Sequence, residues 1–201
     1  EGGQVSRLKK KQGFKRFPSA KKVAGMNIDD ASILYKDMAF MLKDVGINLN
    51  FAPVVDLDIN SNSLAIGKVG RSYSKEPNKV AMYAKALILA HSSAKVVTVI
   101  KHFPGHGSAA DDTHLGFVDV TNSWLEEELE PYRLLIKENF VDMVMSSHVF
   151  QANIDDVYPA SLSVEHIENL LRFDIGYDGV VITDDLQMGA ISKFYDLKEI
   201  V

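Results

Sequence analysis

Short apolar runs alternate with amphipathic helical segments along this chain, and this alternation restricts the folds that it can adopt. The β-branched run from Val96 to Ile100 predicts a buried strand at 96–101. Further strands are predicted at 47–53, 141–148 and 179–183, the last of them buried, with helices between them. Regular alternation of strands and helices is typical of a parallel sheet with helices packed against it.

The predicted helices are recognised by apolar residues at helical spacing and by the residues that start them. Their start signals are Asp29 or Asp30, Ser74 with Pro77, the capping-box pattern Ser123-Trp124-Leu125-Glu126, and Ser163. A fifth helix is predicted to begin between Leu186 and Tyr195. His91 falls at the end of the second helix, and we expect it to be a surface or helix-end residue.

Polar residues follow every predicted strand: Asp56, Lys101 with His102, His148, and Asp184. A Rossmann sheet would gather such residues at one switch point beside a glycine-rich fingerprint, and the chain has no G-x-G-x-x-G. A TIM-type (β/α)8 barrel instead builds its active site from the loops after all of its strands, and takes about 250 residues. We therefore expect residues 1–201 to form a single catalytic domain, an α/β barrel segment truncated at both ends.

Composition excludes several classes of partner without naming one. The formal net charge of -5 gives no reason to expect nucleic acid or an acidic membrane surface. The chain has no cysteine, which excludes disulfides and thiolate metal sites. No apolar run approaches the roughly 20 residues of a membrane span, so we expect no membrane segment in this chain.

Titratable residues are concentrated in one stretch of the chain. Lys101-His102-Phe103-Pro104-Gly105-His106-Gly107 is followed, after four residues, by Asp112-Thr113-His114. A buried strand leads into this loop, whose glycines and proline allow sharp bends. Core packing has no use for so many ionisable groups at one place, so the stretch is predicted to be an active-site loop.

A retaining glycosidase is a chemistry that these residues could perform. Asp184 could attack an anomeric carbon, and His114 could protonate the leaving oxygen. Asp112 would accept the other ring N–H of His114 and so fix its tautomer. The residues predicted to bind or line the sugar site are Arg71, Lys101, His102 and His148.

Other roles remain open for the same residues. Zinc or iron could be ligated by His102, His106, Asp112 and His114, although their spacing is not the helical i, i+4 arrangement of H-E-x-x-H. Lys101 could form a Schiff base with a carbonyl substrate. An inactive sugar-binding barrel is a non-enzymatic alternative, against which the complete set of catalytic residue types argues.

Four residues near these motifs are predicted to have structural roles. Asp185 is expected to cap a helix rather than to act as a nucleophile, and Asp56 to hold neighbouring loops. His106 is expected to be part of the loop scaffold, and Trp124 to pack against a helix rather than against a sugar.

The stretch at 101–114 resembles the signature of glycoside hydrolase family 3, in its bacterial β-N-acetylglucosaminidase (β-hexosaminidase) branch. Further similar segments extend along the chain: Glu1-Gly2-Gly3, Asn50 to Asp56, Gly70-Arg71-Ser72-Tyr73, Ser147-His148, Pro159 to Ser163, and Ile182 to Leu186. The sequence departs from the family at Gln4, where an arginine is common. The aspartate that precedes E-G-G in the family is not part of this chain.

The resemblance implies a retaining exo-enzyme on a TIM-type barrel, which removes non-reducing terminal N-acetylglucosamine from peptidoglycan fragments. It implies Asp184 as the nucleophile that forms a covalent glycosyl intermediate, His114 as the acid/base and Asp112 as its dyad partner. Sugar binding is implied for Arg71, Lys101 and His102. No metal or organic cofactor is implied.

The resemblance also admits other activities of the family. Water and phosphate could both take the sugar from the intermediate, so a phosphorylase or another family 3 β-glycosidase is an alternative. The expected substrates are small carbohydrates, such as muropeptides that contain N-acetylglucosamine or chito-oligosaccharides. The implied compartment is cytoplasmic in a Gram-negative type that recycles peptidoglycan, and otherwise secreted or in the cell envelope.

Overall fold

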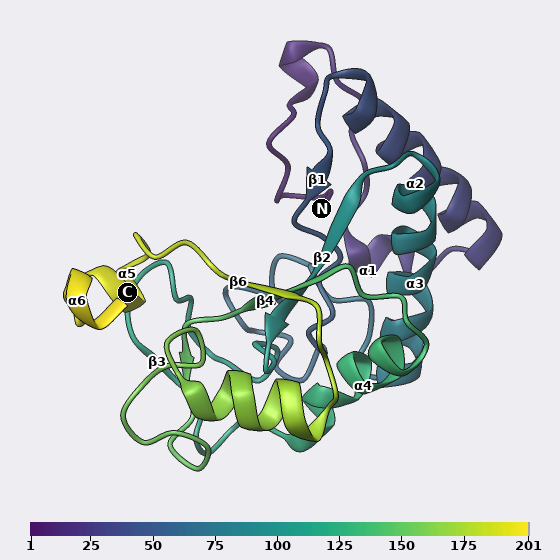
Figure 1. Cartoon of the computed structure of the whole chain (residues 1–201). Coiled ribbons are helices and arrows are strands. Elements are labelled where there is room, and N and C mark those ends of the chain that lie inside the picture. The colour runs from purple at the N-terminus through teal and green to yellow at the C-terminus, as the bar shows by residue number, and fades with distance from the viewer. Residues whose placement is uncertain (201) are drawn as a thin grey trace.

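A parallel sheet lies at the centre of the fold, which a computed structural model describes for residues 1–200 (Figure 1). Its strands lie in the order β1-β2-β4-β6, and all of them are parallel. They are β1 (Leu49–Asn50), β2 (Val97–Phe103), β4 (Met143–Ser146) and β6 (Val180–Thr183). A separate parallel pair joins β3 (Val118–Asp119) to β5 (Val149–Phe150).

Helices connect the strands, and Figure 1 shows α2, α3 and α4 along one side of the sheet. The helical elements are η1 (Lys10–Gln12), α1 (Ala20–Val23), α2 (Ile28–Asp44), α3 (Pro77–Ser93), η2 (Glu126–Leu129), α4 (Glu130–Lys137), η3 (Glu165–Asp174), α5 (Gly189–Ser192) and α6 (Leu197–Ile200). Within residues 1–200, none of the helices combines the length and apolar character that crossing a bilayer requires. The predicted alternation is confirmed, and the arrangement is that of a TIM-type barrel segment.

The main core fills the space between the sheet and these helices. On α3, the apolar residues Val80, Ala84 and Leu87 are buried at helical spacing. They belong to the same cluster as Ile100 of β2 and Val144 of β4. Burying each large aliphatic side chain contributes about 1.5–3 kcal/mol, so this cluster fixes the sheet against its helices and holds the strand ends in place.

Several strands differ from the prediction in their bounds or in their burial. β1 is shorter than the strand predicted at 47–53, because Pro53 cannot donate to a ladder, and beyond it only an isolated bridge joins Val54 to β2. β2 extends past its predicted end to Phe103. β6 was expected to be buried, but it is an outermost strand of the sheet within residues 1–200, and Val180 is 56% exposed there.

Helix starts also differ from the prediction. α2 is capped by Asn27, whose side chain accepts a hydrogen bond from the amide of Asp29, so neither Asp29 nor Asp30 is the cap. The third helix begins at Glu126 rather than at Ser123, because the side chain of Glu128 reaches back to the amide of Leu125.

His91 lies in the last turn of α3, but it is completely buried rather than at the surface. Its Nδ1 lies 2.9 Å from the carbonyl of Leu87, and its Nε2 lies 3.0 Å from the side-chain nitrogen of Asn50. Burial lowers the pKa of His91 to about 4. The helical pattern of α3 could not reveal this burial, since it depends on contact with the chain at β1.

Candidate active site

The parallel register brings together the polar residues at the strand ends. Phe103 of β2 is paired with Ser146 of β4, and Ser146 with Thr183 of β6. The amide of Asp184 donates to the carbonyl of Ser146 at 2.9 Å. The predicted site residues that share this edge of the sheet are Lys101, His102, His148 and Asp184.

Asp184 directly follows β6 and is surrounded by groups that favour its charged form. Burial alone would raise the pKa of Asp184, but His102, the amide of Asp185, His148 and Lys101 together lower it below its ordinary value of 3.8. The carboxylate is therefore ionised at neutral pH. A negatively charged oxygen among cations and donors is the state that a carboxylate nucleophile requires.

Arg71 and Lys101 meet at the carboxylate of Glu1. Arg71 donates from Nε and Nη2 at 2.8 Å each, and Lys101 Nζ lies 2.6 Å from Glu1 Oε1. Burial on its own would raise the pKa of Glu1, but Lys101 and Arg71 hold it far below its ordinary value. A two-pronged contact with arginine fixes direction as well as distance, so Glu1 orients both cations that the sequence predicts to bind a sugar.

His102 is held at both of its ring nitrogens. Nδ1 lies 2.6 Å from Asp56 Oδ2, and Nε2 lies 3.1 Å from Arg71 Nη2. Arginine can only donate, so Nε2 accepts, and Nδ1 carries the hydrogen that is donated to Asp56. A sugar hydroxyl would have to replace one of these partners in order to bond to a ring nitrogen of His102.

Asp56 is completely buried and holds the start of the loop after β2. Its Oδ1 accepts from the amides of His102 at 3.1 Å and His106 at 2.8 Å. Burial would raise the pKa of Asp56, but the hydrogen bonds from the ring and the amide of His102 lower it. The predictions that Asp56 holds neighbouring loops and that His106 is loop scaffold are both confirmed, and burial lowers the pKa of His106 to about 4.

Glu128 is a second buried carboxylate beneath the same loop. Its Oε2 accepts from the amides of Gly107 at 2.8 Å and Ser108 at 3.3 Å. Gly105 has a φ of +125°, and a Cβ there would lie 2.5 Å from the Cβ of Glu128, so the close approach requires glycine. Burial raises the pKa of Glu128 to about 7.

Asp112 and His114 lie on the loop 108–117, which is named the flap from here on. Nδ1 of His114 lies 2.7 Å from Asp112 Oδ1, which also accepts from the amide of His114 at 3.0 Å. Burial would raise the pKa of Asp112, but these bonds from His114 lower it. The ring of His114 is 64% exposed, so a bound molecule could reach its Nε2 while Nδ1 stays paired.

His148 lies at the end of β4, and both of its ring nitrogens have protein partners. Nδ1 lies 2.7 Å from Ser161 Oγ, and Nε2 lies 3.0 Å from the carbonyl of Asp185. The carbonyl can only accept, so Nε2 carries the hydrogen, and Nδ1 accepts from the serine hydroxyl. His148 therefore holds the backbone next to Asp184, and contact of a ring nitrogen with sugar would need an exchange of partners.

The four residues considered as metal ligands fall into two groups. His102 and His106 are buried against Asp56, whereas Asp112 and His114 form their own pair on the flap. Within the described residues 1–200, no three histidine, aspartate or glutamate side chains are grouped so that they could hold a metal ion. Their placement does not support the metal-ligand interpretation.

Sequence reasoning gave no role to Glu1 or Glu128. Glu1 was noted only as part of a motif, and the signal that could have revealed its function was an acid directly before two glycines. Glu128 stands three residues after Leu125, which is the spacing of a capping box, although the pattern was assigned to Ser123 and Glu126. Trp124 packs as predicted, and its indole donates to the carbonyl of Pro104 at 3.2 Å.

An ionised carboxylate among cations at the strand ends of a barrel segment is an arrangement suited to a glycoside hydrolase. The profile of the glycosyl hydrolase family 3 N-terminal domain matches residues 1–201. The chain therefore belongs to glycosyl hydrolase family 3, as the sequence motif indicated.

Its relatives are named as hexosaminidases. The chain is 37% identical to "Beta-hexosaminidase LpqI" of Mycobacterium tuberculosis, over 100% of this chain and 53% of the relative. It is 37% identical to "Beta-hexosaminidase" of Tolumonas auensis, over 94% of this chain and 56% of the relative. The chain thus spans about half the length of these two curated relatives.

Solved structures give the same result for the fold. The structure of a family 3 β-N-acetylglucosaminidase from Paenibacillus sp. str. FPU-7 matches with a TM-score of 0.88 and 38% identity, over 97% of this chain and 37% of that one. A β-N-acetylhexosaminidase from Beutenbergia cavernae matches with a TM-score of 0.89 and 29% identity, over 96% of this chain and 59% of that one.

Proposed function

We propose that this chain carries the catalytic site of a retaining exo-β-N-acetylglucosaminidase. Asp184 attacks the anomeric carbon and forms a covalent glycosyl ester, while His114 protonates the leaving oxygen. His114 then takes a proton from the water that releases the sugar. Asp112 holds the ring hydrogen on Nδ1 and stabilises the imidazolium that forms during the reaction.

The observation that carries this proposal is the charge arrangement around Asp184. Its carboxylate has a lowered pKa, owing to His102, the Asp185 amide, His148 and Lys101, and so is ready to attack without a separate base. A carboxylate whose charge is this well stabilised is a poor general acid. The proton must therefore come from another group, and the Asp112–His114 pair has an exposed nitrogen to provide it.

The substrate class rests on the relatives and on the donors in the site. The two relatives cited above are named as hexosaminidases, and the Paenibacillus enzyme as a β-N-acetylglucosaminidase. In this chain, Arg71 and Lys101 are oriented by Glu1 toward the strand ends, where they can donate to sugar hydroxyls. We propose terminal N-acetylglucosamine on peptidoglycan fragments as the natural substrate.

The test is hydrolysis of aryl β-N-acetylglucosaminides by the full-length protein. Asp184→Asn should reduce turnover at least about 10³-fold, because an amide cannot form the ester. His114→Ala should slow substrates with poor leaving groups by about 10²-fold or more, and activated ones far less. Asp185→Asn is the matched control. Asp185 does not cap α5, whose N-cap is Met188; its side chain accepts from the amide of Gln187 at 2.9 Å. Asparagine can keep that bond, so this variant should hydrolyse the substrate at close to the wild-type rate.

A slow fluorinated substrate gives a direct readout of the intermediate. Intact mass should increase by one glycosyl group, and peptide mapping should place the adduct on Asp184. Near-normal rates in both the Asp184 and the His114 variants would refute the assignment. Product analysis with and without inorganic phosphate then separates a hydrolase from a phosphorylase.

A further inference from the structure

The flap is attached to the segment that follows the nucleophile strand. The amide of Ala190, in α5, donates to the carbonyl of Thr113 at 3.1 Å, and Lys193 Nζ lies 3.0 Å from the carbonyl of Leu115. Figure 1 shows the chain that precedes β3 running alongside α5. These two bonds hold the backbone on either side of His114.

Three phenylalanine rings reinforce this attachment and are named the aromatic cluster. Phe117 of the flap lies 5.1 Å from the ring of Phe150, at the end of β5, and 5.7 Å from the ring of Phe194, just after α5. The rings are tilted by 43° and 56°, which are favourable arrangements for aromatic pairs. Phe117 is 40% exposed and Phe194 is 56% exposed, so the cluster lies at the surface rather than in the core.

The two partners of Phe117 come from the elements that carry the rest of the site. Phe150 belongs to β5, close after His148, and β5 pairs with β3 at the base of the flap. Phe194 lies on the chain that runs on from Asp184 through α5. The aromatic cluster therefore connects the loop that bears His114 to the ends of β4 and β6.

We propose that Phe194 is a positioning residue, which sets the height of His114 over a sugar bound at Asp184. This inference rests on the proposed function. General acid catalysis demands an accurate position of the proton donor, and a displacement of about 1 Å can cost about 10²-fold in rate. Without the Phe194 ring, Phe117 keeps its contact with Phe150 but loses its contact with the segment after α5. The two backbone-directed bonds then restrain the flap against that segment without support from a ring.

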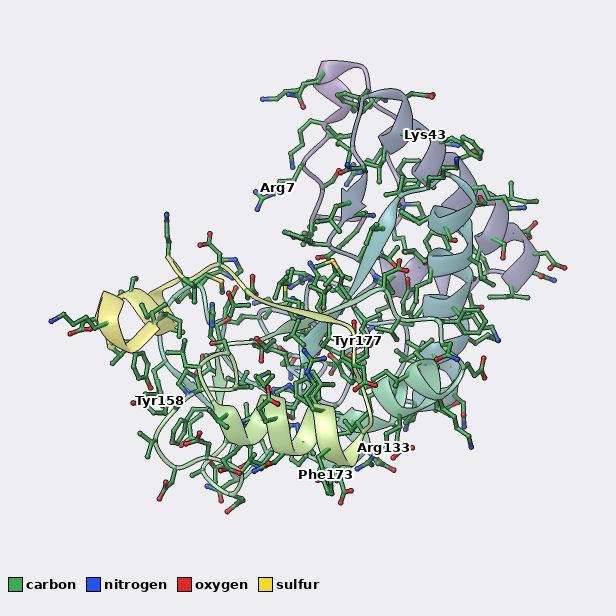
Figure 2. The ribbon with its side chains drawn as sticks, in the orientation of Figure 1. Arg7, Lys43, Arg133, Tyr158, Phe173 and Tyr177 are labelled. Carbon is green, nitrogen blue, oxygen red and sulfur yellow. The ribbon has the colours of Figure 1, made fainter. Side chains whose placement is uncertain are left out.

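The experiment compares kcat/KM for a poor and an activated aryl β-N-acetylglucosaminide in the full-length protein. Phe194→Ala should lower kcat/KM about tenfold for the poor leaving group, which needs the proton. The activated substrate should change by less than about twofold. Phe194→Leu, which keeps apolar contact with Phe117, should recover most of the loss. Phe173→Ala is the control, because Phe173 lies at one end of η3, is 85% exposed and takes no part in the cluster (Figure 2).

Gly189→Ala provides an independent variant. A Cβ at Gly189 would lie 3.1 Å from the carbonyl oxygen of His114, so it should push the flap outward without removing a ring. The same selective loss for the poor leaving group is expected. Hydrogen exchange at the amide of Ala190, which is bonded to the flap, should be faster in Phe194→Ala.

The outcomes separate this inference from the proposed function. If His114→Ala itself shows no dependence on the leaving group, the proposed acid/base assignment fails. If it does, and Phe194→Ala behaves like Phe173→Ala, only the positioning role is refuted. If Phe194→Ala lowers kcat/KM equally for both substrates, Phe194 supports the fold instead. If it raises KM alone, Phe194 contacts the aglycone. Either result would overturn the proposal.

Discussion

Asp56→Asn is a sharp test of the buried part of the site, because it removes one charge and keeps the shape of the side chain. In the native protein, Oδ1 accepts from two backbone amides and Oδ2 accepts from Nδ1 of His102. An asparagine offers one oxygen and one NH2 group. Whichever way it is turned, the NH2 group faces a donor.

The imidazole cannot remove this conflict. If its hydrogen moved from Nδ1 to Nε2, that N–H would face Nη2 of Arg71, which can only donate. At least one charge-assisted hydrogen bond worth about 1.5–3 kcal/mol is lost, and an unsatisfied buried donor costs about 1–3 kcal/mol more. We therefore expect the free energy of unfolding to fall by about 3–5 kcal/mol.

Thermal unfolding of the full-length protein at pH 7 measures this loss. At about 2–4 °C per kcal/mol, Asp56→Asn should melt at least about 6 °C lower than wild type. Asp119→Asn is the matched control, because its exposed oxygen bonds to the amide of Thr121 and asparagine can keep that bond. It should change stability by less than about 0.5 kcal/mol. A melting temperature for Asp56→Asn within about 2 °C of wild type would refute the donor argument.

The pH dependence adds a second readout for the same variant. The pKa of Asp56 is lower in the folded protein than its ordinary value of 3.8. Its charge therefore contributes stability above about pH 4, and that contribution disappears as the pH falls through the folded pKa. Asp56→Asn should lack this part of the acid-induced loss.

Two further predictions concern the carboxylates that sequence reasoning missed. The folded pKa of Glu128 is about 7 against 4.5, so wild type should lose stability as the pH rises from 4.5 to 7. Glu128→Gln keeps an oxygen for Gly107 and should remove that loss, which urea unfolding at pH 5 and pH 8 would detect; an unchanged pH dependence contradicts the assignment. Glu1→Gln should raise KM at least about tenfold, since Arg71 and Lys101 lose their shared anion. Its control, Glu138→Gln, breaks only a half-exposed pair with Lys85 and should leave KM within about twofold; an equal KM for both variants would contradict the orienting role of Glu1.

The fold could be predicted from the sequence because local patterns of apolar and polar residues indicate its strands and helices. The apolar run before Lys101 marks β2, and the regular alternation requires a parallel sheet. Errors occurred where long-range contact decides the outcome. His91 is buried because its ring bonds to Asn50, and β6 is exposed because it is an outermost strand of the sheet within residues 1–200; local periodicity indicates neither.

The candidate site, like the fold, could be predicted in part. The predicted strand ends indicated which titratable residues would lie together at one edge of the sheet. Asp112 and His114 form the hydrogen-bonded pair expected from their spacing. The sequence could not predict which residues far apart in the chain form hydrogen bonds or ion pairs with one another. Glu1 meets Arg71 across the fold, and Glu128 meets the amide of Gly107, so the groups that orient the site were recognised only in the structure.

Apart from the bond between Asp56 and the ring of His102, Asp56 and Glu128 hold the loop after β2 through its main-chain amides. Every residue except proline supplies such an amide, so these bonds do not themselves require a particular side chain at residue 106 or 108. The residues that this path requires are Gly105 and Gly107, where a Cβ would collide with Glu128 and with the carbonyl of Leu57. The shape of this loop is therefore set by two buried carboxylates and two glycines.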